Sequence, residues 1–426
     1  MSGQEVSQSS MRPARVTTLV LLFGAGTVNF LDRASLSIAN TSVRADLHLT
    51  ATQMGWLLSW FSLSYGFAQL PLMELLGRVG SRRSLGAGLF VWSTAQLLTG
   101  YVRGFAPFAF LRTLLGLGEA PFYPAAISTI RESFSPSLRG RATAVISSSQ
   151  NIALAAAPPV LTFIMLRLGW RAMFVVLGAL GLIVAFAWLI LHHDQSKITR
   201  SEVEEPLPRE RLAFKVLLQQ RAIWGIMLGW GGINYTAWLY MAWLPGYFQG
   251  QRHLSVSQSG WLTSVPFLAG ALGMHLSGVV ADRRSISGVP LTVIHRWNLV
   301  VGMLVSAAST LLVTHCHSTI QAAAAISVAL FTIHYAGTSG WGYVQAVAPQ
   351  RFVGEIGALQ NFAGFLIASV APIATGWSLD RFNSFTLALA LCSVVTSLGA
   401  LSYATLAKTD ELQVEEHRQL VPSTPR

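Results

Sequence analysis

Apolar segments long enough to cross a bilayer recur about twelve times in this 426-residue sequence. A helix needs roughly 20 apolar residues to span the ~30 Å hydrocarbon core of a membrane. Because the sequence is also 52% hydrophobic and only 11% charged, it predicts an all-α membrane protein with twelve transmembrane helices. The expected spans lie near residues 16–40, 53–76, 84–101, 105–130, 142–166, 172–191, 221–248, 257–281, 292–314, 320–348, 354–377 and 384–406.

The net charge of +11 could indicate nucleic-acid binding, so the distribution of basic residues must decide. Of the 29 lysines and arginines, two lie within spans, 21 fall in expected cytoplasmic segments and six fall in outer loops. This positive-inside bias predicts a multi-pass membrane protein with both termini in the cytoplasm. The six in outer loops are Arg44, Arg103, Arg167, Arg171, Arg252 and Arg381.

An internal repeat divides the sequence into two halves. Residues 48–57 (HLTATQMGWL) match residues 253–262 (HLSVSQSGWL) at six of ten positions with an offset of 205, and Gly140 and Ala144 match Gly354 and Ala358 with an offset of 214. We therefore predict two pseudo-symmetric six-helix bundles, 16–191 and 221–406, joined by a cytoplasmic linker, 192–220, and flanked by cytoplasmic tails, 1–15 and 407–426. Transporters built from parallel halves bind substrate where the halves meet.

Two of the expected spans carry buried charges of both signs. Asp32 and Arg33 lie in the first span with Asn29 one helical turn earlier, and Arg112 and Glu119 lie seven residues apart in the fourth. Seven residues is close to two helical turns, so Arg112 and Glu119 project in the same direction. A charge at the centre of a membrane helix costs roughly 2.5–3.5 kcal/mol even on lenient scales, so these groups are expected to face a partner or a water-filled cavity.

These charges have two interpretations. A buried acid and base can simply lock two helices together, but locking needs one pair and the sequence supplies two, which favours groups that change partners. Neutral polar and aromatic residues within the other spans provide a candidate binding surface, although many such residues only join helices. They are Gln150, Asn151, Asn234, Tyr235, Trp238, Tyr240, Asn298, His334, Ser339, Trp341, Gln345, Gln360 and Asn361.

A short basic turn follows the second span of each half, at Arg78 and at Asp282-Arg283. Asp282 can bridge to the ends of neighbouring helices, so we predict that Asp282, Arg283 and Arg78 act at a cytoplasmic gate. The alternative is that these arginines only set the membrane topology. An acid contributes little to topology, so the presence of Asp282 favours the gate. The first half has Gly77 where the second has Asp282.

Several motifs together carry a family resemblance. Asn29-Phe-Leu-Asp32-Arg33, Arg112-x3-Gly116-x2-Glu119-Ala-Pro121, Gly278-x3-Asp282-Arg283 and Gln360-Asn361-Phe-Ala-Gly364 resemble the anion:cation symporter family of the major facilitator superfamily. Nearly the whole chain is similar to bacterial transporters of galactonate, glucarate and hexuronate, and the family includes vesicular glutamate and sialic acid carriers.

The resemblance implies roles for individual residues. Asp32 and Glu119 are the implied protonation sites, Arg33 the contact for the substrate carboxylate, and Arg112 the partner of an acid. Gln150 and Asn361 fall where such carriers hydrogen-bond the substrate, and Ser339 and Trp341 also match. With the neighbouring polar and aromatic residues, the predicted substrate-binding set is Arg33, Asn29, Gln150, Tyr235, Trp238, Ser339, Trp341 and Asn361.

These observations predict proton-coupled uptake of a small organic anion, such as a sugar acid, by a monomer without a cofactor; sodium coupling stays open. An arginine offers two parallel donors to a carboxylate, and a carboxyl group in low dielectric can load and release a proton. The alternatives are a major facilitator exporter of organic acids or drugs and a transporter-derived membrane sensor. We predict no metal site and no enzyme activity, because His315-Cys316-His317 lacks a fourth ligand and no catalytic constellation lies at bilayer depth.

Overall fold

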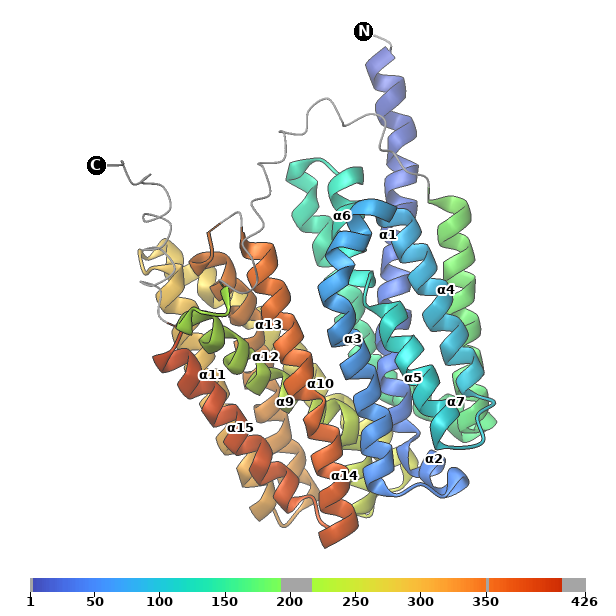
Figure 1. The fold of residues 1–426 in the computed structure, drawn as a ribbon, viewed down its shortest axis with the longest axis vertical. Helices are drawn as coiled ribbons and strands as arrows, with labels where there is room; N and C mark the ends of the chain where they lie inside the picture. The colour runs from blue at the N-terminus through green and yellow to red at the C-terminus, as the bar shows by residue number, and fades with distance from the viewer. Residues whose placement is uncertain (1–2, 193–216, 350–351, 408–426) are drawn as a thin grey trace, which may run out of the picture. The chain divides into compact units, whose positions relative to one another are not determined.

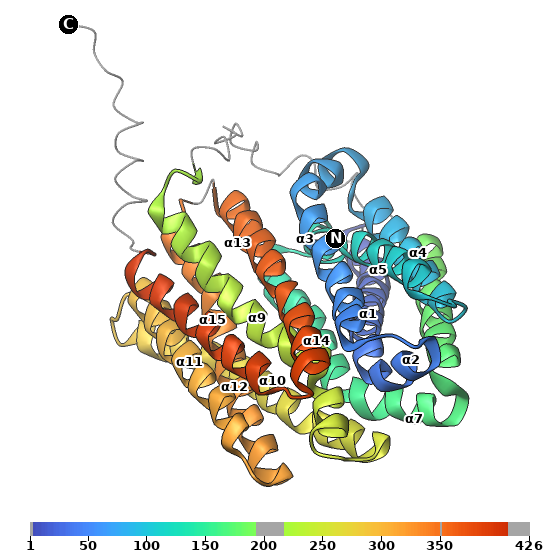
Figure 2. The ribbon, with the colours of Figure 1, turned by 60° about the horizontal axis from the view of Figure 1, so that its bottom comes forward.

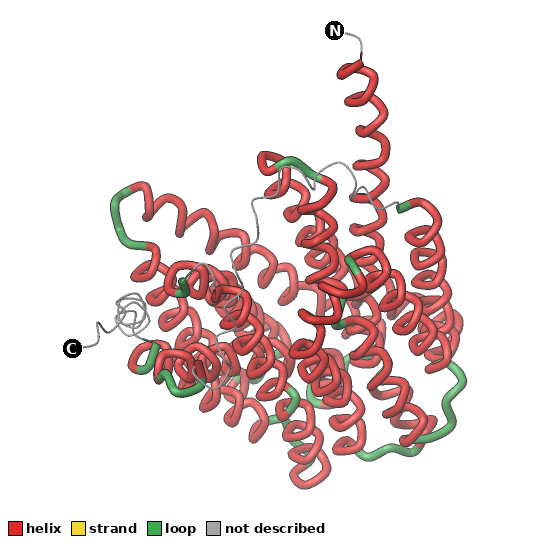
Figure 3. The backbone as a smooth tube through the Cα atoms, turned by 45° about the horizontal axis from the view of Figure 1, so that its top comes forward, coloured by secondary structure: helices red, strands yellow, loops and turns green. Residues whose placement is uncertain are grey.

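The computed structural model describes residues 3–192, 217–349 and 352–407. These residues form helices joined by short loops, with no strand among them (Figure 3). Most of the predicted linker, 193–216, and nearly all of the predicted C-terminal tail, 408–426, lie outside the described residues.

The first half of the chain contains a succession of long helices. In order they are α1 (Gly3–Ile38), the short α2 (Asn40–Leu47), α3 (Ala51–Val79), α4 (Ser81–Thr99), α5 (Phe105–Glu119), α6 (Phe122–Ser133) and α7 (Pro136–Leu191). The 56-residue α7 contains a turn at Gly169, whose φ of 83° and ψ of 162° are not helical, so it comprises two spans. Pro121 separates α5 from α6, and the two together correspond to the predicted span 105–130.

The second half repeats this succession. Its helices are α9 (Arg221–Gly250), α10 (Val256–Ile286), α11 (Leu291–Leu312), the short 3₁₀-helix η1 (Val313–His315), α12 (Thr319–Val347), α13 (Val353–Ala368), α14 (Val370–Phe382) and α15 (Thr386–Thr405). When α7 is divided at Gly169, and α5–α6 and α13–α14 are each counted as one interrupted span, the described residues contain the twelve predicted spans. The predicted all-α, twelve-span fold class is confirmed.

Seven stretches in the described part of the chain are long and apolar enough to count as spans by length and hydropathy alone. The span α9 falls outside that set because its apolar surface comes largely from tryptophan, tyrosine and glycine. These residue types are common in membrane helices although they lower mean hydropathy.

Contacts divide the chain into two compact units. The described part of the first unit comprises residues 3–192 and 248–264, and that of the second comprises 217–247, 265–349 and 352–407. Within the first unit α5 packs against both α3 and α4, and α1 and α4 pack against α7 (Figures 1 and 2). Within the second unit α11 packs between α12 and α15.

Local geometry repeats along with the sequence. His48 and His253, at equivalent places in the repeat, both have left-handed backbone angles, with φ of 51° and 55°. Each precedes a helix whose first turn is closed by a Ser or Thr and a Gln three residues later, an arrangement that satisfies exposed backbone N–H groups. The sequence repeat is therefore also a repeat of backbone structure.

A second repeated feature lies at helix ends. In the first unit Arg82 donates to the carbonyl oxygen of Leu189 at 2.7 Å. In the second unit Arg296 donates to the carbonyl oxygens of Tyr403, at 3.2 Å, and Ala404. Arg296 and Tyr403 follow Arg82 and Leu189 by the same 214 residues, so in both units an arginine caps the C-terminal end of the last helix.

Candidate functional site

The predicted charged residues of α1 and α5 are brought together in the core of the first unit. Asp32 and Glu119 are fully buried, and Arg112 is 2% exposed. Each of Asp32, Arg33 and Glu119 interacts electrostatically with Arg112. The two spans singled out in the sequence therefore form one buried cluster of two acids and two bases.

An ion pair between Arg33 and Glu119 forms the centre of this charged cluster. The Nε of Arg33 donates to Oε2 of Glu119 at 2.7 Å, and the two side chains are 9% and 0% exposed. Short, charge-assisted hydrogen bonds of this kind are about twice as strong as neutral ones. The family resemblance implies an acid partner for Arg112. In the structure, the arginine bonded directly to Glu119 is Arg33.

Aromatic rings surround the Arg33 guanidinium. Its Cζ lies 5.1, 5.2 and 4.8 Å from the ring centroids of Phe30, Phe61 and Tyr65. Cation–π contacts contribute about 0.5–1 kcal/mol each, and more where water is excluded. Sequence reasoning missed Phe61 and Tyr65; their spacing of four residues along α3 places both on one helix face, which is the signal that could have indicated them.

Glycines set the position of α5 between its neighbours. A Cβ atom on Gly116 would lie 2.6 Å from the carbonyl oxygen of Phe61 in α3, and one on Gly118 would lie 2.8 Å from the backbone nitrogen of Trp92 in α4. Both distances are too short for any side chain. The close approach of α3, α4 and α5 therefore requires glycine at both positions and fixes α5 against these two helices.

Several polar atoms in the charged cluster have no hydrogen-bond partner among the described residues. They include both carboxylate oxygens of Asp32, Oε1 of Glu119 and one terminal nitrogen of Arg112. Arg112 does donate through Nε to the carbonyl oxygen of Leu57 at 3.4 Å, and Asn29, fully buried, lies near Glu119. An isolated buried charge is costly, so these groups have the capacity to take up a proton or a ligand group.

The second unit contains a neutral network instead. Ser277 of α10 and Ser339 of α12 lie 3.0 Å apart through their hydroxyl oxygens, Asn298 of α11 donates to Ser339 at 3.2 Å, and Tyr335 donates to Asn298 at 3.1 Å. Ser339 is fully buried. Its hydroxyl thus joins three helices of its own unit, and its role at the substrate stays a prediction.

The remaining predicted binding residues lie in both units. Gln150 of α7 is half-buried in the first unit, and the side chain of Asn151 lies outside the described residues. In the second unit Tyr235 and Trp238 of α9 are 3% and 8% exposed, whereas Trp341 of α12 is 41% exposed.

Aromatic contacts join this second set. The ring centroids of Trp238 and Phe365 lie 5.8 Å apart, and those of Trp341 and Trp230 lie 5.6 Å apart. Asn361 of α13 is half-buried. Trp230, one helical turn before Asn234, is a further residue that the sequence reasoning missed.

The predicted gate residues are exposed at helix ends. Arg78 lies at the end of α3, and Asp282 and Arg283 lie in the last part of α10. Asp282 interacts electrostatically with His295 at the beginning of α11. The ring of His295 packs against Gly342 of α12, since a Cβ there would lie 2.6 Å from its Nε2. Asp282 thus lies where three helix ends of the second unit meet.

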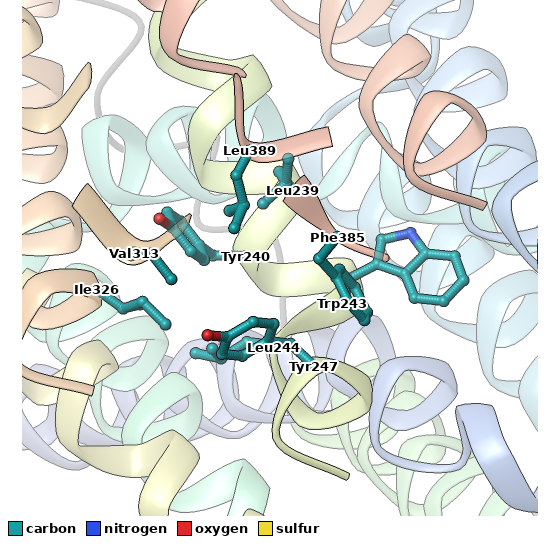
Figure 4. A pocket seen from close by; sticks show the side chains of 9 residues that line it. All are labelled: Leu239, Tyr240, Trp243, Leu244, Tyr247, Val313, Ile326, Phe385 and Leu389. Atoms are coloured by element: carbon teal, nitrogen blue, oxygen red, sulfur yellow. The ribbon is translucent and has the colours of Figure 1, made fainter. Parts of the chain in front are cut away.

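An apolar cavity is also present in the second unit (Figure 4). Aromatic and aliphatic side chains line it, so it does not suit a charged, hydroxylated ligand. The lining residues are Leu239, Tyr240, Trp243, Leu244, Tyr247, Val313, Ile326, Phe385 and Leu389.

Comparison with known families decides the identity of this architecture. Residues 22–372, most of the chain, match the Major Facilitator Superfamily. The chain belongs to this superfamily. It is accordingly a membrane transporter and not an enzyme, as the sequence predicted.

Relatives of this transporter are named for sugar acids. It is 42% identical to the "Probable L-galactonate transporter" of Escherichia coli (strain K12), over 94% of this chain and 91% of that protein. It is 30% identical to the "Probable galactarate/D-glucarate transporter GarP" of the same strain, over 90% and 93%. It is 28% identical to the "D-galactonate transporter" of Escherichia coli O6:H1, over 92% and 95%.

Solved structures support the same fold for the transporter. A bacterial homologue of the human lysosomal transporter Spinster, in an inward-facing and unoccupied conformation, matches with a TM-score of 0.79 at 16% identity, over 93% of this chain and 98% of that one. A D-xylose-proton symporter matches with a TM-score of 0.69 at 14% identity, over 92% and 98%. At these identities the likeness concerns the fold alone.

Proposed function

We propose that this transporter is a proton-coupled symporter that carries a sugar acid or a related hydroxy-carboxylate into the cell by alternating access. The observation that carries the proposal is the 2.7 Å ion pair between Arg33 and Glu119 in a buried site. It joins the residue best suited to bind a carboxylate to a residue that can take up a proton.

The first step is a competition for Arg33. While Glu119 is ionised it occupies the guanidinium of Arg33, and a substrate carboxylate must displace it. A proton on Glu119 removes its charge and weakens the ion pair, so the planar fork of Arg33 becomes available for two parallel hydrogen bonds to the substrate. Substrate and proton then enter the site together, which is the defining property of symport.

Asp32 supplies a second site for a proton. Its two oxygens lack hydrogen-bond partners among the described side chains, and it interacts electrostatically with Glu119 and Arg112. An ionised carboxylate without a partner is destabilised in a low-dielectric environment, and protonation removes that destabilisation. Asp32 and Glu119 therefore form a coupled pair in which the charge of one influences proton binding at the other.

The remaining predicted residues complete the cycle. Asn29 and Gln150 belong to the first unit, and Tyr235, Trp238, Ser339, Trp341 and Asn361 belong to the second; we assign both sets to substrate binding. Asp282, Arg283 and Arg78 act at the cytoplasmic gate. We place the protein in the bacterial inner membrane as a monomer. We assign both termini to the cytoplasm, which the positive-inside bias supports.

The substrate class rests on the relatives. Proteins covering nearly the full length of this chain are named for L-galactonate, D-galactonate, and galactarate with D-glucarate. Their shared chemistry is a carboxylate on a short hydroxylated carbon chain. A buried arginine and a set of neutral polar groups suit that chemistry.

Transport by purified protein in proteoliposomes tests the proposal. We expect labelled L-galactonate or D-galactonate to accumulate inside when the external solution is made acidic, and a protonophore to abolish the accumulation. Accumulation driven by a sodium gradient at uniform pH would contradict proton coupling. Net movement of substrate against the proton flux would instead favour the exporter.

A further inference from the structure

We propose that Gln96 of α4 is a positioning residue for the charged cluster of the first unit. Acting through Ser35, it fixes the rotation of α1 and thereby sets the pH range in which Glu119 takes up a proton. The inference rests on the proposed function, because it takes Glu119 as the group that binds the coupling proton. Neither Gln96 nor Ser35 was singled out in the sequence, and neither belongs to the charged cluster.

Two hydrogen bonds connect α4 to the backbone of Asp32. The amide nitrogen of Gln96 donates to the hydroxyl of Ser35 at 3.0 Å, and that hydroxyl donates to the carbonyl oxygen of Asp32 at 2.7 Å. Gln96 is 1% exposed, and Ser35 and Asp32 are fully buried. A serine hydroxyl can donate one hydrogen bond and accept others, so Ser35 uses both capacities to join the two helices.

The carboxyl group of Asp32 depends on its backbone for its position. Neither carboxylate oxygen has a hydrogen-bond partner among the described residues, so no hydrogen bond holds the carboxyl group directly. A serine that bonds to a carbonyl group in the preceding turn also bends a helix, and Ser35 does this at Asp32 itself. The connection to Gln96 therefore constrains α1 at the residue whose side chain relies most on the orientation of the helix.

The α4 end of this connection is held in place by α7. A Cβ atom on Gly178 of α7 would lie 2.5 Å from the Cα of Leu97, the residue after Gln96, and one on Gly181 would lie 2.9 Å from the Cβ of Ser93, one turn before it. Both distances are too short for a side chain, so α4 and α7 are in close contact on either side of Gln96. Gln96 thus extends toward α1 from a fixed helix.

The rotation of α1 matters because Arg33 directly follows Asp32. Arg33 forms the 2.7 Å ion pair with Glu119 of α5, and a nearby cation favours the ionised form of a carboxyl group. If α1 gains freedom to rotate, the average separation of this pair increases, and Glu119 binds a proton more readily. Gln96 therefore influences proton uptake without contacting the acid.

The charged groups that face the two acids come from α1 and α5. Asp32 interacts electrostatically with Glu119 and Arg112, and Glu119 also interacts with Arg33. From α3, the phenol group of Tyr65 interacts with Arg33. The residues of α4 and α7 at the connection itself are uncharged. Replacing Gln96 by another neutral residue thus changes the geometry of the existing charges and adds or removes none.

Infrared spectroscopy of the purified, ligand-free transporter tests the inference. The C=O stretch of protonated carboxyl groups is followed as the pH is changed, and the contribution of Glu119 is the part that disappears in Glu119→Gln. Removing the connection from either end, by Gln96→Met or by Ser35→Ala, should raise the midpoint of this titration by about half a pH unit, or roughly threefold in proton affinity. The pH profile of D-galactonate uptake in proteoliposomes should move in the same direction.

Two further variants distinguish positioning from a general loss of structure. When Gln96→Met is combined with Ser35→Ala, the shift should equal that of either single variant and not their sum, because both remove the same connection. Thr99→Val is the matched control. Thr99 is buried in the same helix, and its hydroxyl donates to the carbonyl oxygen of Ala95 within that helix at 2.8 Å. This control should alter the unfolding temperature and leave the midpoint unchanged.

The outcomes separate this inference from the proposed function. An unchanged midpoint in both folded single variants would overturn the role of Gln96, while proton-driven uptake would leave the proposed function standing. An equal shift in Thr99→Val would also overturn it, because any weakening of α4 would then suffice. If the wild type transports no sugar acid while the midpoint shifts as expected, the proposed substrate is wrong and the role of Gln96 stands. The absence of a Glu119 titration in the wild type would overturn both.

Discussion

The two units share a succession of helices but differ in the chemistry of their cores. In the first unit Arg112 and Glu119 lie on α5; the positions 214 residues later, on α12, are Ile326 and Ile333, both at most 1% exposed. At the offset of 205 that relates the other matched segments, Asn29 corresponds to Asn234 and Arg33 to Trp238. The repeat retains backbone features, such as the His48 and His253 turns, while the buried side chains have diverged.

This difference separates features that the fold requires from features that it does not require. Isoleucine at the equivalent positions shows that a unit of this architecture forms without buried charges there. Burying charged groups costs several kcal/mol unless they are well paired, so the first unit retains them against a stability cost. We infer that the proposed ion and carboxylate chemistry belongs to the first unit.

The largest expected effect comes from removing the proposed coupling acid. Glu119→Gln imitates the permanently protonated form, so the loaded transporter should still exchange internal for external substrate. It should fail to accumulate substrate against a gradient under an imposed pH difference. Counterflow and pH-driven uptake in proteoliposomes, measured on the same preparation, would show the two activities separate.

Glu132→Gln provides the control for this prediction. Glu132, at the end of α6, accepts hydrogen bonds from the hydroxyls of Ser81 and Ser128 and lies outside the charged cluster, so accumulation should persist. If Glu119→Gln retains pH-driven accumulation, the coupling proton is carried elsewhere, with Asp32 the next residue to test. If exchange is lost too, Glu119 has a structural or binding role.

Arg33→Lys is expected to have the next largest effect. Lysine keeps the charge but loses the planar pair of donors that matches a carboxylate. Substrate affinity should drop at least tenfold, or about 1.4 kcal/mol, in equilibrium binding to the purified protein. Near-normal affinity would remove Arg33 from the substrate site and break the assignment of carboxylate recognition to the first unit.

A smaller, kinetic effect is expected at the second unit. Asp282→Asn removes the charge that interacts with His295 where three helix ends meet. We expect turnover to slow more than binding weakens, with a shift toward inward-open states. Transport rates, together with the accessibility of introduced cysteines from the cytoplasmic side, would measure this. If neither changes, Asp282 has only a local structural role.

Much of the architecture could be predicted because it follows from one-dimensional patterns. Apolar runs of membrane length indicated the spans, and Asp32, Arg33, Arg112 and Glu119 were exceptional enough inside them to indicate a common site. The spacing of Arg112 and Glu119 by two helical turns was sufficient to place both on one side of α5.

The pairing inside the charged cluster could not be predicted in the same way. Whether Glu119 pairs with Arg33 or Arg112 depends on the relative height and rotation of α1 and α5, and the contacts of Gly116 and Gly118 fix α5 only against α3 and α4. These contacts are tertiary, as are those between Arg33 and the rings of α3. Trp230 was missed for a related reason. A tryptophan in an apolar span is usually interpreted as a packing residue, and only the structure shows that the indole nitrogen of Trp230 has no hydrogen-bond partner among the described residues.

The smallest expected effect compares the two units directly through the paired helix caps. Arg296 donates to two carbonyl groups at the end of α15, and Arg82 donates to one at the end of α7. A hydrogen bond from a charged donor contributes about 1.5–3 kcal/mol, less where the pair is open to solvent, and the Arg82 contact is the more exposed of the two. Arg296→Ala should therefore lower the unfolding temperature in detergent more than Arg82→Ala, while both variants still bind substrate with near-wild-type affinity, because neither residue belongs to the substrate site. An equal loss in both would mean that the second bond of Arg296 adds nothing to the cap. A larger loss for Arg82→Ala would indicate that the unit containing the buried charges depends more on its helix ends than the unit with the neutral core.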